Sequence, residues 1–377
     1  MSRGGSLGTI LVTGGAGWLG SYIVELLVND SDFSQVVSSV EPQVTPNRQI
    51  PGVIYHDCDI SNSTQLRALL DKVKPRIIIH SIGPGFFASP EAHRRVTYDL
   101  SKQLIAEARK HPSIQAVVYT GTVEGMNMTP KDNTRPMRED EVTLHSLHSG
   151  PNAYSRTKAA VDRLMREANT PEALFDNTSG NYENQLLTTV LRVTGLYGPR
   201  DRLTVVEMLK LVNTPNTKFQ LGPNTLVHDW IHVENCARAH VLAAKALVNP
   251  TGERADGRGF FVSDGKPKKF WDFTRKIWEE AGDANWAPDG PHKVIQIPFW
   301  LVLFAVGSIE WLFWIFTLGM VRPSASTMTF EYMKTGGWFD ISETRNVLGY
   351  EPEFDTDEGI RRTIQWFKEN GGWNKDV

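Results

Sequence analysis

The feature that most constrains the fold is a glycine-rich sequence near the start of the chain, Thr13-Gly14-Gly15-Ala16-Gly17-Trp18-Leu19-Gly20. A short apolar run over residues 9–12 leads into it, and an amphipathic stretch over residues 18–28 follows it. A strand, a glycine turn and a helix in this order are typical of the first turn of a dinucleotide-binding α/β fold.

Each glycine of this turn has a physical reason. We expect Gly14 to permit the tight turn, Gly17 to let the backbone approach a pyrophosphate, and Gly20 to let the helix pack closely on the strand. The helix N-terminus at Trp18 and Leu19 would favour the negative charge of the phosphates. The alternative is an ordinary glycine-rich turn without a ligand.

Strand-like and helical segments alternate well beyond this turn. We expect strands at 9–12, 36–40, 53–55, 76–80, 116–120 and 187–193, and helices at 18–28, 64–72, 96–109 and 154–167. Such alternation requires parallel pairing with right-handed crossovers that cover both faces of the sheet. The sequence therefore predicts an α/β fold built on a doubly wound parallel Rossmann sheet.

The regular alternation ends after about residue 198. We assign residues 1–198, with returning segments from the second half, to a dinucleotide-binding domain, and residues 199–377 mainly to a smaller substrate-binding region. Open α/β folds bind ligands at the carboxyl ends of their strands, so this region is expected to pack there.

Composition narrows the classes of protein. The formal net charge is −3 without long runs of one sign, which gives no electrostatic support for a nucleic-acid partner. Cys58 and Cys236 are the only two cysteines and stand far apart, which favours a reducing compartment. The first eight residues lack the apolar stretch of a secretory signal, so we expect a protein that is not secreted.

The cofactor preference depends on residues after the second and third strands. Glu41 lies 21 residues beyond Gly20, where a carboxylate normally binds the adenosine ribose and favours NAD over NADP. A solvated turn residue is the alternative for Glu41, and Arg48 is the residue that would favour NADP. Asp59 fits either a contact with the adenine amino group or an exposed capping role.

The candidate catalytic residues are Thr122, Tyr154 and Lys158. The tyrosine and lysine are four residues apart, so they lie on one face of a helix. A neighbouring ammonium is expected to lower the pKa of the phenol, and the same lysine can donate to a nicotinamide ribose. Thr122 ends the fifth strand, where its hydroxyl can hold a substrate oxygen. No metal site is predicted.

In the order of these motifs the chain resembles the extended short-chain dehydrogenase/reductases, and within them the 3β-hydroxysteroid dehydrogenase family with its sterol-4α-carboxylate 3-dehydrogenase branch. The resemblance covers nearly the whole chain. The matching pieces span residues 13–20, 80–84, 119–124, 151–158, 191–199, 229–235, 338–341 and 347–350.

The resemblance implies a serine-like role for Thr122, a general acid/base role for Tyr154, and a supporting role for Lys158. It also implies a hydrophobic small-molecule substrate and allows a homodimer. The residues that it places at the cofactor, besides those discussed above, are Ile60, Ser81, Gly83, Val193 and Leu196 together with Tyr154 and Lys158.

The chain departs from the family pattern at three places. Thr120-Gly121-Thr122 replaces the usual Thr-Ser-Ser, and Val193 replaces a proline. Where an asparagine often supports the catalytic lysine, residues 96–99 offer Thr97 and Tyr98. The proton relay to bulk water is therefore expected to differ.

An apolar, aromatic segment at 297–320 breaks the pattern of the remaining chain. We favour a segment that lies in a membrane face, on the cytoplasmic side and with the endoplasmic reticulum membrane as a candidate. The second interpretation is a buried helix pair that lines an apolar substrate pocket. A transmembrane span is the least favoured, because Glu310 lies inside a segment that is otherwise long enough.

The predicted function is hydride transfer between NAD, with NADP as the alternative, and a secondary alcohol or ketone on a hydrophobic polycyclic molecule such as a sterol, terpenoid or polyketide. One alternative is an isomerase or a nucleotide-sugar epimerase of the same superfamily that acts without net redox. Another is a protein that binds a dinucleotide without catalysis.

Overall fold

The structure is a computed structural model that describes residues 7–40, 49–128, 135–317 and 333–373. Its centre is a seven-stranded sheet with the strand order β11-β6-β5-β4-β1-β2-β3, in which every neighbouring pair is parallel. The strands are β1 (Thr9–Thr13), β2 (Gln35–Val40), β3 (Val53–Asp57), β4 (Ile77–His80), β5 (Ala116–Thr122), β6 (Leu187–Val193) and β11 (Arg258–Val262).

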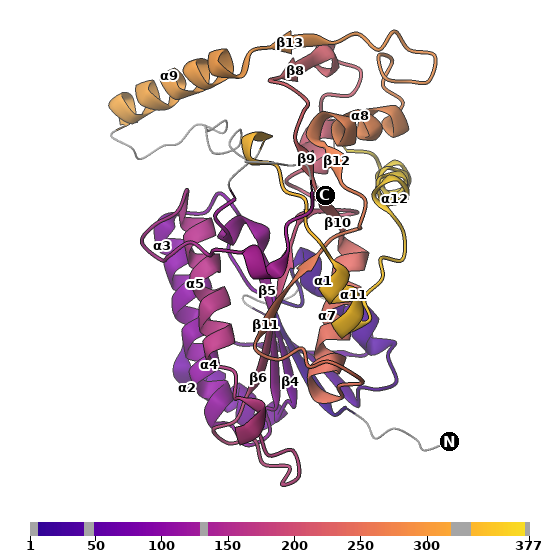
Figure 1. Cartoon of the computed structure of the whole chain (residues 1–377). Helices are drawn as coiled ribbons and strands as arrows, with labels where there is room; N and C mark the ends of the chain where they lie inside the picture. Colours follow the sequence, from indigo (N-terminus) through magenta and orange to yellow (C-terminus); the bar gives the residue numbers. More distant parts are fainter. Residues whose placement is uncertain (1–6, 41–48, 129–134, 318–332, 374–377) are drawn as a thin grey trace.

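Helices cover both faces of the sheet (Figure 1). On one face, α1 (Trp18–Val28) and α7 (Val233–Val248) pack against each other and enclose one apolar core. On the other face, α2 (Ser63–Val73), α4 (Leu100–Lys110) and α5 (Ala153–Glu167) enclose a second core. The predicted doubly wound α/β architecture is therefore confirmed.

The strand order reverses between β1 and β4, which are neighbours in the sheet although β2 and β3 separate them in sequence. Ligands of open α/β sheets bind in the crevice at such a switch point, outside the carboxyl ends of the strands. The glycine turn directly follows β1, so the topology places it at the mouth of this crevice.

A smaller lobe lies beyond the carboxyl ends of the strands (Figure 1). It contains the short strand pairs β7 (Gly195–Tyr197) with β10 (Trp230–His232), β8 (Phe219–Leu221) with β13 (Ile295–Ile297), and β9 (Val227–His228) with β12 (Lys268–Lys269). Helices α6 (Val205–Leu209), α8 (Phe270–Ala281) and α12 (Thr356–Glu369) surround a third core that is rich in aromatic side chains. Two elements from the second half of the chain join the first domain: β11 pairs with β6 in the main sheet, and α7 packs on this sheet. The boundary near residue 198 stays a prediction.

Helix α9 (Phe299–Thr317) projects sideways from this lobe, to the left in Figure 1. Its side chains Trp300 and Phe304 are 70% and 71% exposed. This exposure contradicts the prediction of a buried helix pair for the described part of the segment. Within the described ranges, none of the helices combines the length and apolar character that crossing a membrane requires.

Candidate active site

The glycine turn has the tight, closely packed conformation that its sequence predicts. Gly14 has a φ of +76°, which glycine adopts without strain. A β-carbon on Gly20 would lie only 2.1 Å from the carbonyl oxygen of Gly14, so a larger residue would push helix and turn apart. Gly17 is the N-cap of α1 and no side chain caps this end. The backbone amides at Trp18 and Leu19 therefore fit an anionic phosphate group.

The segment after β4 connects this turn to α5. The hydroxyl of Ser81 donates to the carbonyl oxygen of Thr13 at 2.8 Å, which ties the ends of β4 and β1 together. A β-carbon on Gly83 would lie 3.8 Å from Nζ of Lys158. The structure thus brings Ser81, Gly83 and Lys158 to the same edge of the sheet.

Of the residues expected near the adenosine, Asp59 and Ile60 lie within the described part of the chain. Glu41 and Arg48 lie outside the described residues. Asp59 accepts hydrogen bonds from the backbone nitrogen of Ser61 at 2.8 Å and from its hydroxyl at 2.6 Å, and these bonds lower the pKa of the carboxyl. Asp59 therefore closes the turn before α2, whose N-cap is Asn62, so the predicted capping role is not seen, and the adenine contact stays a prediction. Ile60 beside it is buried.

Tyr154 lies in the first turn of α5, whose N-cap Asn152 accepts from the backbone nitrogen of Ser155 at 2.8 Å. Its ring is held edge-to-face by Phe86, with ring centres 4.9 Å apart, and by His93 at 5.7 Å. The phenol of Tyr154 hydrogen-bonds with Thr122, which ends β5 at the carboxyl edge of the sheet.

The expected lowering of the phenol pKa is wrong for the structure as described. Burial raises the pKa of Tyr154 to about 12, a hydrogen bond with Thr122 opposes this rise, and the charge of Glu124 adds to it. The physical reason is that the phenolate loses its hydration, while the ammonium of Lys158 donates to a backbone carbonyl instead.

Lys158 is buried, and its Nζ donates to the carbonyl oxygen of Thr120 at 2.9 Å. It also lies 5.0 Å from the centre of the Tyr119 ring. Burial lowers the pKa of Lys158 to about 8. An ammonium has three donors, so the bond to Thr120 leaves two for other groups.

A buried histidine on α7 bonds to the side chain of Thr120, the residue whose carbonyl oxygen accepts from Lys158. Nδ1 of His240 lies 2.8 Å from the carbonyl oxygen of Cys236, to which it donates, and Nε2 lies 2.8 Å from the hydroxyl of Thr120. Because the ring donates at Nδ1, its Nε2 accepts from the Thr120 hydroxyl. Sequence reasoning missed this brace between α7 and β5.

Thr122 ends β5, and its hydroxyl oxygen accepts from the backbone nitrogen of Glu124 at 3.2 Å. Val193 stands opposite Thr122 in the register of β5 with β6, and Leu196 follows in β7. The predicted residues around a nicotinamide thus come from neighbouring strand ends, although their contacts with a cofactor stay a prediction.

Glu124 is a second residue that sequence reasoning missed as an ionisable group of the site. Burial raises the pKa of its carboxyl to about 7, and its charge acts on Tyr154. Its position two residues after Thr122 was the available signal. A carboxyl that titrates near neutral pH beside the phenol makes the site sensitive to pH.

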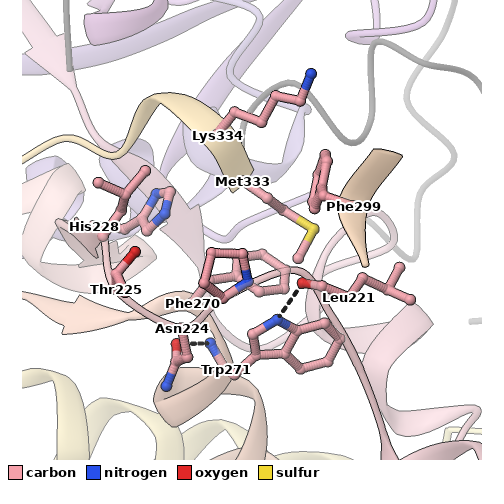
Figure 2. Close-up of a pocket in the computed structure, with 11 residues that line it drawn as sticks. Leu221, Asn224, Thr225, His228, Phe270, Trp271, Phe299, Met333 and Lys334 are labelled. Atoms are coloured by element: carbon pink, nitrogen blue, oxygen red, sulfur yellow. Dashed lines mark hydrogen bonds between the residues drawn. The ribbon is translucent and has the colours of Figure 1, made fainter. Parts of the chain in front are cut away.

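A cavity of about 210 Å³ lies in the smaller lobe, at the base of α9 (Figure 2). Phe299, the first residue of α9, lies close to Lys334, whose Nζ is 5.4 Å from the ring centre. The walls of the cavity are mainly apolar. They comprise Leu221, Pro223, Leu226, Phe270, Trp271, Phe299 and Met333, with the polar residues Asn224, Thr225, His228 and Lys334. An apolar portion of a ligand fits such a lining.

Comparison of sequences identifies relatives along nearly the whole chain. The model of the 3-beta hydroxysteroid dehydrogenase/isomerase family matches residues 11–287. The sterol-4-alpha-carboxylate 3-dehydrogenase ERG26, decarboxylating, of Gibberella zeae is 31% identical over 310 residues, which cover 81% of this chain and 96% of that protein. The 3 beta-hydroxysteroid dehydrogenase/Delta 5→4-isomerase of vaccinia virus is 28% identical, covering 95% of this chain and 98% of that protein.

Solved structures share the fold. The dTDP-glucose 4,6-dehydratase of Bacillus anthracis in complex with NAD has a TM-score of 0.66 at 16% identity and covers 96% of this chain and 97% of its own. The UDP-glucuronic acid 4-epimerase of Bacillus cereus in complex with NAD has a TM-score of 0.66 at 17% identity and covers 96% of this chain and 99% of its own. At these identities the similarity concerns the fold alone.

Proposed function

The chain belongs to the 3-beta hydroxysteroid dehydrogenase/isomerase family of oxidoreductases, and on this premise we propose that it transfers a hydride between NAD and the secondary alcohol or ketone of a sterol. NADP is the alternative cofactor. The observation that carries the proposal is the meeting of Thr122, Tyr154 and Lys158 at the carboxyl edge of the sheet, beside the glycine turn.

The cofactor would be held by residues from the first half of the chain. The open N-terminus of α1 at Gly17 suits the pyrophosphate, and Gly20 lets this helix pack closely on the glycine turn. The two unused donors of Lys158 suit ribose hydroxyls. When bound, the nicotinamide supplies the acceptor or donor of the hydride.

Tyr154 exchanges the proton of the reacting hydroxyl. With a pKa of about 12 it is protonated at neutral pH, so it can donate to the oxygen of a ketone. In the opposite direction it must first lose its proton, which a cation near the phenolate would favour. Thr122 donates a hydrogen bond to the oxygen as negative charge develops there.

A sterol substrate is supported by the names of the relatives and by the apolar surfaces of the smaller lobe. Four curated relatives are sterol-4-alpha-carboxylate 3-dehydrogenases. The cavity at the base of α9 offers an apolar lining, and α9 itself exposes Trp300 and Phe304. We therefore propose that α9 lies on a membrane surface from which a lipophilic substrate reaches the enzyme.

An isomerase activity is the second candidate, because two of the viral relatives are named as both dehydrogenases and isomerases. An isomerase forms its product without net formation of reduced cofactor. An assay that follows both the sterol products and the reduced cofactor therefore separates the two candidates.

The test uses purified protein, NAD and 3β-hydroxysterols with and without a 4α-carboxylate, and it follows both NADH absorbance and sterol products. We expect sterol-dependent NADH formation that Tyr154→Phe lowers by about 10²- to 10⁴-fold while the Kd for NAD stays unchanged. Tyr182→Phe is the matched control, since Tyr182 is a buried tyrosine that stacks on Phe175 in the polar loop before β6. Retained turnover in Tyr154→Phe would defeat the assignment.

A further inference from the structure

A buried histidine on the far face of the sheet is linked to the catalytic lysine through one residue of β5. His240 on α7 is fully buried, and it has no role in the reaction proposed above. Its Nε2 lies 2.8 Å from the hydroxyl of Thr120, and the carbonyl oxygen of the same threonine accepts from Nζ of Lys158 at 2.9 Å. These contacts form a continuous path from α7 through the sheet to α5.

The path crosses the sheet because successive side chains of a strand point to opposite faces. The ring of Tyr119 lies in the core beneath α5, 5.0 Å from Nζ of Lys158. The next side chain, Thr120, bonds to His240 on the other face. At this point β5 has passed the end of β4, whose last pair joins His80 to Tyr119, and keeps only its pairing with β6. Side-chain contacts therefore hold Thr120 where pairing with β4 has ended.

Helix α7 holds the imidazole of His240 in one orientation. Nδ1 donates to the carbonyl oxygen of Cys236, one turn earlier, at 2.8 Å. The beginning of α7 is itself tied to the smaller lobe, because the side-chain amide of Asn235 donates to Asp264 at 2.8 Å. Bonds at both ring nitrogens fix the rotation of the ring and its tautomer. His240 is therefore a rigidly held acceptor for Thr120.

The electrostatics of this region keep His240 uncharged. Burial lowers the pKa of His240 to about 4, the bond with Cys236 opposes this change, and the charge of Lys158 adds to it. At neutral pH the ring is therefore neutral and keeps Nε2 as an acceptor. A protonated ring would lose this acceptor and would repel the ammonium of Lys158.

We propose that His240 is a positioning residue for Lys158, because it holds the side chain of Thr120 and thereby fixes the carbonyl oxygen to which the ammonium donates. The proposal rests on the proposed dehydrogenase function. A buried ammonium depends on such an acceptor to keep its charge. With this bond in place, the two other donors of Lys158 stay directed to the ribose hydroxyls of the cofactor.

The first measurement needs neither substrate nor cofactor. ¹³C NMR of the full chain with labelled lysine side chains, assigned with Lys158→Met, follows the protonation of Lys158. The wild type should titrate at a pKa of about 8. In His240→Phe the carbonyl of Thr120 is held less firmly, so we expect the acid dissociation constant of Lys158 to rise about 10-fold. Thr120→Val, which removes the hydroxyl that His240 holds, should have the same effect, and Thr120→Ser should not.

The matched control is Thr188→Val, which removes the hydroxyl of another buried strand threonine, bonded to Met165 at 2.6 Å. The titration of Lys158 should not change in this variant. The double variant His240→Phe, Thr120→Val should be no worse than either single one, because both remove the same bond. An unchanged titration of Lys158 in folded Thr120→Val protein overturns the proposal, and this variant decides the question even if His240→Phe does not fold.

The second measurement is the pH dependence of kcat/KM for the reduction of a 3-ketosterol with NADH, which reports ionisations of the free enzyme. The charge of Lys158 stabilises the phenolate that remains when Tyr154 has donated its proton. Activity should therefore fall as the pH rises through the pKa of Lys158, and this fall should begin at lower pH in His240→Phe and Thr120→Val. Glu124, with a pKa of about 7, contributes equally in all variants.

The two measurements separate positioning from a merely structural role. A uniform loss of kcat/KM, without a shift of the pH at which activity falls, would overturn the role of His240. Absence of hydride transfer by the wild type in both directions would instead overturn the proposed function, and the NMR titration of Lys158 would still decide whether His240 fixes its partner.

Discussion

Helices α5 and α9 depart from the rule of apolar inside and polar outside in opposite ways. On α5, Lys158 and Asp162 follow Tyr154 at intervals of four residues and are buried against the sheet. On α9, Trp300, Phe304 and other apolar side chains are exposed. Burying charge and exposing aromatic surface both cost free energy unless something compensates.

The compensation differs between the two helices. On α5 it comes from the same chain, because Thr120 holds Lys158 and Arg192 pairs with Asp162. On α9 the described residues cover little of the apolar surface, and the membrane surface proposed above would supply the compensation. The comparison teaches that α5 holds a site by internal packing, whereas the described part of α9 leaves its apolar side chains exposed, as the proposed membrane contact requires.

The largest effect should follow from breaking the internal compensation of α5. Nε of Arg192 lies 2.8 Å from Asp162, and both side chains are buried. Arg192→Met leaves this carboxylate with Arg166 alone, so we expect the free energy of unfolding to fall by about 3–5 kcal/mol in urea titrations. Adding Asp162→Leu should recover much of this loss. A double variant as unstable as the single one would show that shape, and not charge, determines the cost.

The next effect concerns the pH dependence of stability near Tyr154. Glu124 has a pKa of about 7 when folded, against an ordinary value of 4.5, so the folded protein keeps a proton that the unfolded chain has lost. The contribution of Glu124 to the free energy of unfolding should therefore fall as the pH rises from about 4.5 to 7 and level off above. Glu124→Gln should be more stable than the wild type at pH 8 by about 2–3 kcal/mol, with no difference near pH 4.5. Parallel stability curves would contradict the buried carboxyl.

The proposed membrane contact of α9 can be tested by removing its exposed rings. The double variant Trp300→Ser, Phe304→Ser should bind phosphatidylcholine vesicles roughly 30-fold more weakly. This corresponds to about 2 kcal/mol for two rings that are partly inserted into the membrane. The free energy of unfolding should change by less than about 0.5 kcal/mol. Leu174→Ser with Leu203→Ser, which alters exposed leucines elsewhere, is the control. Vesicle binding that is equal in both double variants would refute a membrane role for α9.

The smallest effect concerns the end of α5 that carries the phenol. Asn152 stands two positions before Tyr154, and its side chain accepts from the backbone nitrogen of Ser155. Asn152→Ala should lower the free energy of unfolding by about 1 kcal/mol, and Asn152→Asp should keep most of the stability. Thermal unfolding measures both variants. Equal losses in the two would mean that the cap does not stabilise this turn.

Much of the fold could be predicted from the sequence, because its signals are local. A glycine turn after an apolar run, and apolar segments that alternate with amphipathic ones, depend on neighbours within a few residues. The strand at Arg258–Val262 was not predicted, although it joins the sheet beside β6. It lies in a region where regular alternation has ended, and only its pairing partner identifies it.

The candidate site also has features that the sequence predicts and features that it does not. The order of Thr122, Tyr154 and Lys158 along the chain indicates their meeting point, since strand ends and helix N-termini share one edge of a parallel sheet. The pKa of the phenol was predicted in the wrong direction. The sequence shows the spacing of Tyr154 and Lys158, but it does not show that Thr120 takes the ammonium or that burial raises the pKa.

The sequence by itself determined the parallel sheet, the position of the glycine turn and the helix that carries tyrosine and lysine, because turn geometry and side-chain periodicity are properties of short segments. Only the tertiary structure decided that His93 packs against the ring of Tyr154, that His240 bonds to Thr120, whose carbonyl accepts from Lys158, and that α9 points its rings outward. These features depend on contacts between segments far apart in the chain, and such contacts arise only when the whole core is packed.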